Sequence, residues 1–249
     1  MKIEEMNFLE YLGKEEQNLL TSTVNFRKEF DLFYTIDRIY QEPLRRLVVS
    51  KGSVVIPQLY LFVHFYFYFS ISCILRAHLS ESLSSTRKAI DASLTAYKII
   101  LDPSSSQKYV DHDRYFQFIK SNLKKEIDKD SSKYPLAHNL INIHEACSEY
   151  GSHADISSFI HRIERKEISG TSQDQIFVHY FQFPKDEEEY RFYYIVTLQS
   201  FFLMFLIFKP YFDTNLKIID PIWELTITEM GPKLEKLRKA TYDKFNKNP

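Results

Sequence analysis

The stretch that decides the fold is Leu59-Tyr-Leu-Phe-Val-His64-Phe-Tyr-Phe-Tyr-Phe-Ser-Ile-Ser-Cys-Ile-Leu75, an almost unbroken run of aromatic and aliphatic residues. It leads into a second segment, Leu79 to Leu101, whose apolar residues recur every three or four positions. That spacing predicts an amphipathic helix. The helix should end at Asp102-Pro103, because the residue before a proline is pushed out of the helical conformation. The two segments therefore predict a buried helix and a second helix packed against it.

A second apolar run, Phe192 to Phe208, matches the first in length. At 1.5 Å per residue each run makes a helix of about 26 Å, slightly shorter than a hydrocarbon core of about 30 Å. Two membrane spans are one interpretation; two central helices of a soluble bundle, apolar on every side, are the other. The tyrosines, at positions 60, 66, 68, 193 and 194, are not confined to the ends of the runs as they would be in an aromatic belt, which favours the soluble bundle.

Composition narrows the fold class. The 249 residues contain 5 Gly and 9 Pro, too few turn residues for a β-sandwich or barrel. We therefore expect an all-α, multi-helix bundle of seven to nine helices with two central apolar helices and at most one short strand or hairpin, at Ile176 to Phe183. The chain should form a single domain, residues 1–249, with 1–50 as a long N-terminal helical arm and 59–213 as the core bundle.

Two further helices are predicted from local patterns. Apolar residues from Leu19 to Leu47 follow a four-three spacing, which predicts a long helix interrupted or kinked at Pro43. Its narrow seam could pack inside the bundle or form a coiled-coil dimer. Ser152-His-Ala-Asp155 has the form of a capping box, so a helix is expected from Ser152 to about Lys166.

Several kinds of chemistry lack support in the sequence. The balance of 32 Lys and Arg against 33 Asp and Glu gives a net charge of −1, which does not indicate nucleic-acid binding. The eight histidines form no HxxxH or HExxH pair, so no metal site is predicted. Dinucleotide, P-loop and GxSxG motifs do not occur, and we expect no cofactor. Cys73 and Cys147 are read as buried thiols in a cytoplasmic protein, because no secretory signal precedes the first helix.

A set of polar residues among the apolar helices forms the candidate site. Arg87 and Asp91 lie one turn apart on the helix of Leu79 to Leu101. A histidine in the first turn of a helix is held neutral by the helix dipole, which would keep His153 available as a base. The set is either a structural network or a small polar site. Its members are Arg87, Asp91, Tyr97, Tyr150, Ser152, His153 and His161.

These features follow one another in a particular order: an apolar helix, then a helix that carries Arg87 and Asp91 and ends in Asp102-Pro103, then Tyr150-Gly-Ser-His153. In this order of features the chain resembles bacterial all-helical proteins of poorly characterised function that are related to the HEPN (higher eukaryote and prokaryote nucleotide-binding) domains. The resemblance covers about Leu59 to His161. It implies a soluble bundle, often dimeric, with a link to RNA cleavage, toxin–antitoxin pairs or phage defence.

One departure from this pattern bears on the function. The ribonuclease members carry an arginine and a histidine separated by four to six residues on one helix, and no arginine here has a histidine at that spacing. RNA cleavage would therefore require Arg87 and His153 to meet across helices. The leading hypothesis is a helical binding or interaction protein; the alternatives are a ribonuclease that uses Arg87 and His153 and a two-span membrane protein. Whether the chain is an enzyme is left open, and the expected partners are RNA, a partner protein or a second copy of the chain.

Overall fold

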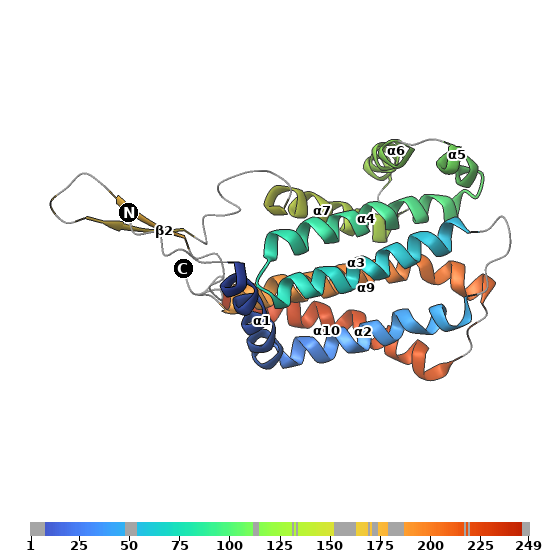
Figure 1. Ribbon diagram of the computed structural model, residues 1–249. Helices are drawn as coiled ribbons and strands as arrows, with labels where there is room; N and C mark the ends of the chain where they lie inside the picture. The colour runs from blue at the N-terminus through green and yellow to red at the C-terminus, as the bar shows by residue number, and fades with distance from the viewer. Residues whose placement is uncertain are drawn as a thin grey trace.

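The computed structural model describes residues 8–47, 54–111, 115–130, 132, 134–151, 163–168, 170, 174–178, 187–216, 218 and 220–245, at some of which only the backbone is described. Over this part of the chain the fold is an all-α bundle that carries one antiparallel hairpin beyond its end (Figure 1). The predicted fold class is confirmed. The elements are α1 (Phe8–Asn25), α2 (Arg27–Arg46), α3 (Val55–Leu75), α4 (Leu79–Leu101), α5 (Ser105–Asp111), α6 (Tyr115–Lys129), α7 (Pro135–Gly151), β1 (Ile163–Glu167), β2 (Asp174–Val178), α9 (Glu187–Asn215) and α10 (Pro221–Phe245).

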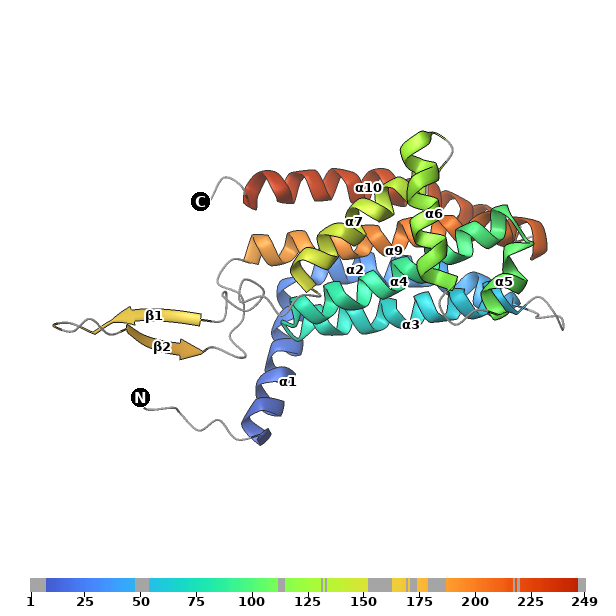
Figure 2. The ribbon, with the colours of Figure 1, turned by 90° about the horizontal axis from the view of Figure 1, so that it is seen from above.

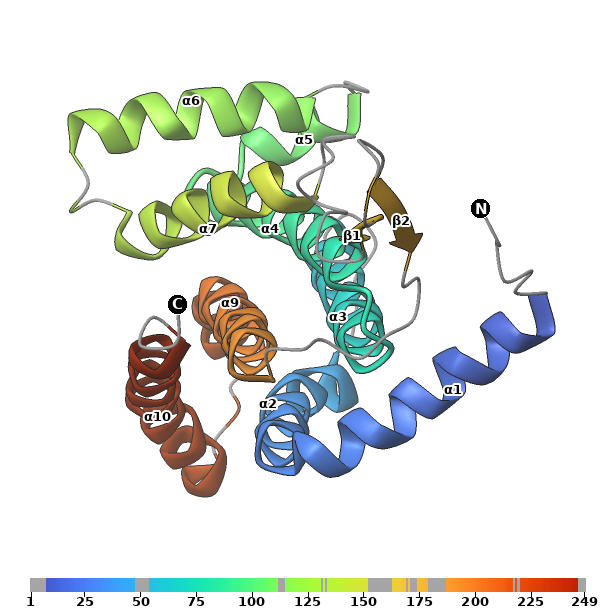
Figure 3. The ribbon, with the colours of Figure 1, turned by 90° about the vertical axis from the view of Figure 1, so that its left-hand side faces the viewer.

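The apolar run at Phe192 to Phe208 forms the middle of α9, which lies at the centre of the bundle. Seen along the helix axes, α9 is surrounded by α2, α3, α4, α7 and α10 (Figure 3). Phe201, Phe205 and Phe208 are completely buried. The ring of Phe67 from α3 lies 4.9 Å from that of Phe201, so the two apolar helices pack directly on each other. Through these contacts more than half of each apolar helix is buried inside the bundle.

Buried tyrosines tie neighbouring helices together through their hydroxyl groups. Tyr40 of α2 donates a hydrogen bond to the carbonyl of Phe201 at 2.6 Å, and Tyr60 of α3 donates to the carbonyl of Tyr40 at 2.8 Å. Tyr190 of α9 donates to the carbonyl of Ile74 at 2.9 Å. These three hydrogen bonds connect α2 to α9, α3 to α2 and α9 to α3, and so fix the three helices relative to one another.

The turn between α3 and α4 is compact and well defined. The His78 amide donates to the Cys73 carbonyl at 2.8 Å and the Ala77 amide to the Ile74 carbonyl at 2.9 Å, the two bonds of a Schellman cap. Ala77 has the positive φ of 65° that this cap requires. The turn reverses the chain, so α4 packs antiparallel on α3. The helix α4 has the bounds predicted from its apolar spacing and from Asp102-Pro103.

The N-terminal region differs from the predicted long helix. The interruption falls at Phe26, between α1 and α2, while α2 continues through Pro43 to Arg46. Phe26 has non-helical torsion angles (φ −106°, ψ 33°) and is completely buried, with its ring 6.0 Å from that of Tyr190. The break lets Phe26 enter the core while α1 projects from the bundle (Figure 2).

The seam from Leu19 to Leu47 packs against the core of its own chain. Of the two interpretations of this seam, packing inside the bundle is therefore the one that the structure shows, and the apolar surface that a coiled-coil dimer would need is already used.

The β1–β2 hairpin shows that a second prediction, the helix from Ser152 to about Lys166, is wrong at its C-terminal end. Residues Ile163 to Lys166, expected at the end of a helix, belong to β1, which pairs with β2 in antiparallel register from Ile163 opposite Val178 to Glu167 opposite Asp174. Of the expected strand at Ile176 to Phe183, Ile176 to Val178 belong to β2, and the remaining residues lie outside the described part of the chain. Gly170, with a φ of 84°, lies between the strands in the left-handed conformation that glycine adopts without strain. Hydrogen bonds to β2 satisfy the backbone groups of β1. A helix-capping rule considers one segment of the chain alone, so it cannot predict this pairing.

Candidate functional site

The predicted pair Arg87 and Asp91 meets a third residue, His144, where α4 crosses α7. The His144 Nε2 atom lies 3.3 Å from Arg87 Nε and 3.1 Å from Asp91 Oδ1. His144 is only 2% exposed. Arg87 and Asp91 share one face of α4 because they are four residues apart, and this face is the one that α7 covers. The pair is therefore an anchor for α7.

His144 has hydrogen-bonding partners on both ring nitrogens. Its Nδ1 lies 3.4 Å from the Ser148 hydroxyl, which itself donates to the His144 carbonyl at 2.7 Å. A hydrogen on Nδ1 thus leaves Nε2 free to accept from Arg87, whereas a hydrogen on Nε2 is donated to Asp91. Either state joins α4 to α7. A buried ring with both nitrogens engaged has no free position for a substrate, so the arrangement is that of a structural tie.

The other predicted site residues do not join this cluster. Tyr97 lies further along α4, where its ring packs edge-on against Tyr134 at 5.9 Å. Burial, with a smaller contribution from Tyr134, raises the pKa of Tyr97. Ser152, His153 and His161 lie outside the described residues, as does the side chain of Tyr150. The expected contact between Arg87 and His153 is therefore still a prediction.

Sequence reasoning missed His144, whose role depends on the crossing of two helices far apart in the chain. The available signal was its position: His144 lies at helical spacing from the buried Leu140, Ile141 and Cys147, so it had to face inward. A histidine on the buried face of a helix needs a polar partner on the facing helix. Arg87 and Asp91 were candidates for that partner.

Cys147 lies one turn from His144 and lines the adjacent groove. It is 2% exposed, and burial raises the pKa of its thiol to about 12, although the charge of Arg87 lowers it somewhat. Burial likewise raises the pKa of Cys73 to about 11. Both thiols are therefore protonated at neutral pH and unsuited to nucleophilic catalysis.

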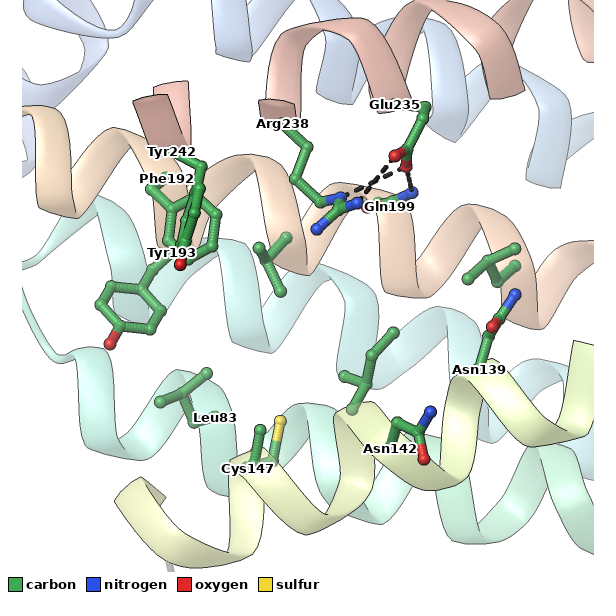
Figure 4. Close-up of a pocket in the computed structure, with 14 residues that line it drawn as sticks. Leu83, Asn139, Asn142, Cys147, Phe192, Tyr193, Gln199, Glu235, Arg238 and Tyr242 are labelled. Atoms are coloured by element: carbon green, nitrogen blue, oxygen red, sulfur yellow. Dashed lines mark hydrogen bonds and ion pairs between the residues drawn. The ribbon is translucent and has the colours of Figure 1, made fainter. Parts of the chain in front are cut away.

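A groove of about 840 Å³ runs between α7 and α10 over the outer face of α9 (Figure 4). Its floor is a single helical stripe of α9, formed by Phe192, Val196, Gln199 and Leu203. The wall on α7 includes Asn139, Asn142, Ile143 and Ala146, and the wall on α10 includes Glu235, Arg238 and Tyr242. The groove thus has a largely apolar floor and partly polar walls.

The polar part of the α10 wall is held in place by its own contacts. Glu235 accepts hydrogen bonds from Arg238 at 2.7 Å and from Gln199 at 2.9 Å (Figure 4). Hydrogen bonds from Arg238 and Gln199 lower the pKa of Glu235, so it is ionised and its charge is balanced by Arg238. At one end of the groove the rings of Phe192 and Tyr242 lie 5.6 Å apart. The α10 wall therefore presents hydrogen-bonding groups and aromatic rings to the groove, and it carries no net charge.

A second, more polar cavity of about 720 Å³ lies where α1 meets α3 and α4. It is lined by Glu15, Arg76, His78 and Lys88 among others. Burial raises the pKa of Glu15, but hydrogen bonds from His78 and Tyr11 outweigh this and lower it. The ionised Glu15 and its neighbours connect α1 to the turn that follows α3.

Among the described residues, no three His, Cys, Asp or Glu side chains are grouped so that they could hold a metal ion. Two helices, α3 and α9, are long and apolar enough to span a membrane, and more than half of each is buried inside the bundle. No family model, curated protein or solved structure matches this chain.

Proposed function

We propose that the protein is a helical binding module that holds an amphipathic helix of a partner protein in the groove between α7 and α10. The observation that carries the proposal is the partly exposed stripe of α9 on the groove floor. Its residues Phe192, Val196, Gln199 and Leu203 follow helical spacing, and other helices of the bundle cover the remaining faces of α9. The groove is therefore the position where one further helix would complete the bundle.

The dimensions and chemistry of the groove fit a helix. From Phe192 to Leu203 the floor extends about 16 Å along α9, which corresponds to three turns of a bound helix. Apolar residues at i, i+3 or i+4, and i+7 of the partner would contact Val196 and Leu203 on the floor. The Asn139 and Asn142 amides on one wall and the balanced Glu235 and Arg238 pair on the other suit uncharged polar flanks.

The resemblance to HEPN-related proteins indicates the kind of biological system to which such a partner would belong. It implies a toxin–antitoxin pair or a phage-defence system, in which the partner would be the other protein of that system. His144 is buried and paired with Arg87, and neither residue lines the groove or the second cavity, which supports a binding role over cleavage. RNA cleavage through Arg87 and His153 is the alternative that the experiment must distinguish.

The experiment selects helical peptides from a displayed library against the wild-type protein. Ala146, an exposed residue on the groove wall, is replaced by tryptophan to block the groove. The matched control is Glu145→Trp, which places the same side chain on the neighbouring exposed position of α7, outside the groove. We expect the selected peptides to carry apolar residues at i, i+3 or i+4, and i+7. Ala146→Trp should weaken their binding by about tenfold or more, a loss of about 1.4 kcal/mol, and Glu145→Trp should not.

Two results would contradict the proposal. Peptides that bind the Ala146→Trp variant as tightly as the wild type would show that the groove is not their site. RNA cleavage by the wild type that disappears in a folded Arg87→Ala variant would favour the ribonuclease. Circular dichroism of each variant confirms that the helices persist.

A further inference from the structure

The outer face of α3 carries a second uncovered apolar surface, on a side of the molecule away from the groove. Five large side chains, which we call the α3 stripe, are between 41% and 60% exposed: Leu61, Phe62, Phe65, Tyr68 and Phe69. Figure 1 shows α3 between α2 and α4, with no described element over most of its outer face. The helix α1 lies beside one end of the stripe, where Phe69 lines the cavity between α1, α3 and α4. Side chains of this size are rarely left together on the surface of a monomer.

The stripe has a symmetric spacing. Its most exposed residue, Phe65, is the midpoint of α3 (Val55–Leu75), and the other four lie three and four residues to either side. A two-fold axis through Phe65, perpendicular to the helix, would bring a second α3 against the first in the antiparallel direction. Phe65 would then meet its own copy, Phe62 would face Tyr68, and Leu61 would face Phe69. Self-complementarity of this kind is what a two-fold interface requires.

The exposed area is sufficient for such a contact. An exposed aromatic side chain presents about 200 Å², so five half-exposed side chains present on the order of 500 Å². Tyr34 of α2, which is 53% exposed and packs beside the stripe through Phe33, adds to this. Two copies would bury about 1,200 Å² in total, the lower end of the range for specific interfaces. The dimer should therefore be specific but of modest affinity.

The surroundings of the stripe disfavour a flat lipid surface. The helix α1 projects from the bundle on the side where α3 is uncovered, so it would hold a bilayer away from the stripe (Figure 2). In addition, Asp37 accepts a hydrogen bond from Tyr68 at 2.7 Å directly beside the stripe, and an ionised carboxylate is costly near hydrocarbon. A second copy can accommodate both features, because two projecting α1 helices can pass on opposite ends of the paired α3 helices.

We propose that the protein forms a symmetric dimer through antiparallel packing of the α3 stripe about Phe65. The test uses the full chain and sedimentation equilibrium. Phe65→Asp places two carboxylates face to face at the two-fold axis and should weaken the dimer by about a hundredfold or more. An equal mixture of Phe65→Asp with Phe65→Lys should restore association, because opposite charges then meet at the same position. Only a pairing of residue 65 with its own copy gives this rescue.

The control is Leu225→Asp, which introduces the same charge at an exposed leucine of α10 and should leave the dimer intact. A wild type that is monomeric at about 100 µM, well above the micromolar Kd of a weak interface, would overturn the proposal. A dimer that persists in Phe65→Asp, or a mixture that does not associate, would also overturn it. Monomeric protein that binds anionic vesicles through Phe65 would assign the stripe to lipid instead.

Discussion

The helices α3 and α9 are nearly equal in hydropathy, and each is long and apolar enough to span a membrane. They differ in how much of their surface the other helices cover. The helix α9 is covered by other helices except along the groove floor, and its Phe201 and Phe205 are completely buried. The helix α3 has one covered face, including Phe67, and one uncovered face, including Phe65 at 60% exposure. Hydropathy alone therefore does not distinguish a core helix from one whose outer face serves as a contact surface. The comparison can be tested residue by residue.

The largest expected effect comes from matched phenylalanines on the two helices. Phe201→Ala should lower the free energy of unfolding by about 3–5 kcal/mol, because it leaves a cavity at the centre of the bundle. Phe65→Ala should change the stability of the dilute protein by less than about 0.5 kcal/mol, since the side chain is on the surface. Urea denaturation followed by circular dichroism measures both values. Similar losses in the free energy of unfolding at Phe201 and Phe65 would contradict the difference in burial between the two helices.

The attachment of α9 to α2 through a buried ion pair gives the next effect. Arg191 donates to both carboxylate oxygens of Glu29, at 2.7 and 2.8 Å, and the Glu29 side chain is only 6% exposed. Arg191→Met should cost about 3 kcal/mol, because it leaves a buried charge unpaired. The control Arg238→Met removes an exposed pair with Glu235 and should cost less than about 1 kcal/mol. Equal losses of stability in Arg191→Met and Arg238→Met would contradict this, because they would show that water reaches Glu29 once Arg191 is removed.

Two buried tyrosines provide a finer test. Tyr40 donates to the Phe201 carbonyl of α9, whereas the Tyr194 hydroxyl is buried with no partner among the described residues. Tyr40→Phe should cost about 1–2 kcal/mol, since it removes a buried hydrogen bond between α2 and α9. Tyr194→Phe should be neutral within about 0.5 kcal/mol or stabilising. Thermal unfolding of both variants distinguishes the two, and a large loss for Tyr194→Phe would indicate a hydrogen bond to a residue outside the described set.

The smallest effect concerns the edge of α3 and depends on pH. Burial raises the pKa of Asp37, but hydrogen bonds from His64 and Tyr68 outweigh it and bring the pKa below the usual 3.8. The resulting stabilisation is present above pH 3.8 and is lost as the pH falls through the lowered value. Asp37→Asn should therefore be less stable than the wild type near neutral pH, by less than about 1 kcal/mol. The difference should shrink in acid; a constant difference across the same pH range would contradict this.

The parts of the fold that depend on local spacing could be predicted from the sequence. The bounds of α4 followed from its apolar stripe and from Asp102-Pro103, and the two central helices followed from their composition. The break at Phe26 could not be predicted, because it depends on that ring entering a core formed by α9. The inward position of His144 could be read from its helical spacing, but its pairing with Arg87 and Asp91 could not, since they meet only where α4 and α7 cross. The β1 strand required a pairing partner that capping rules ignore.

The most direct test of the contrast between α3 and α9 is hydroxyl-radical labelling of aromatic side chains in dilute and in concentrated protein without detergent. We expect Phe62, Phe65 and Phe69 to be labelled in dilute protein and protected in concentrated protein, while Phe201 and Phe205 remain unlabelled at both concentrations. Labelling of Phe201 or Phe205 as strong as that of Phe65, or labelling of the α3 stripe that does not change with concentration, would contradict the account.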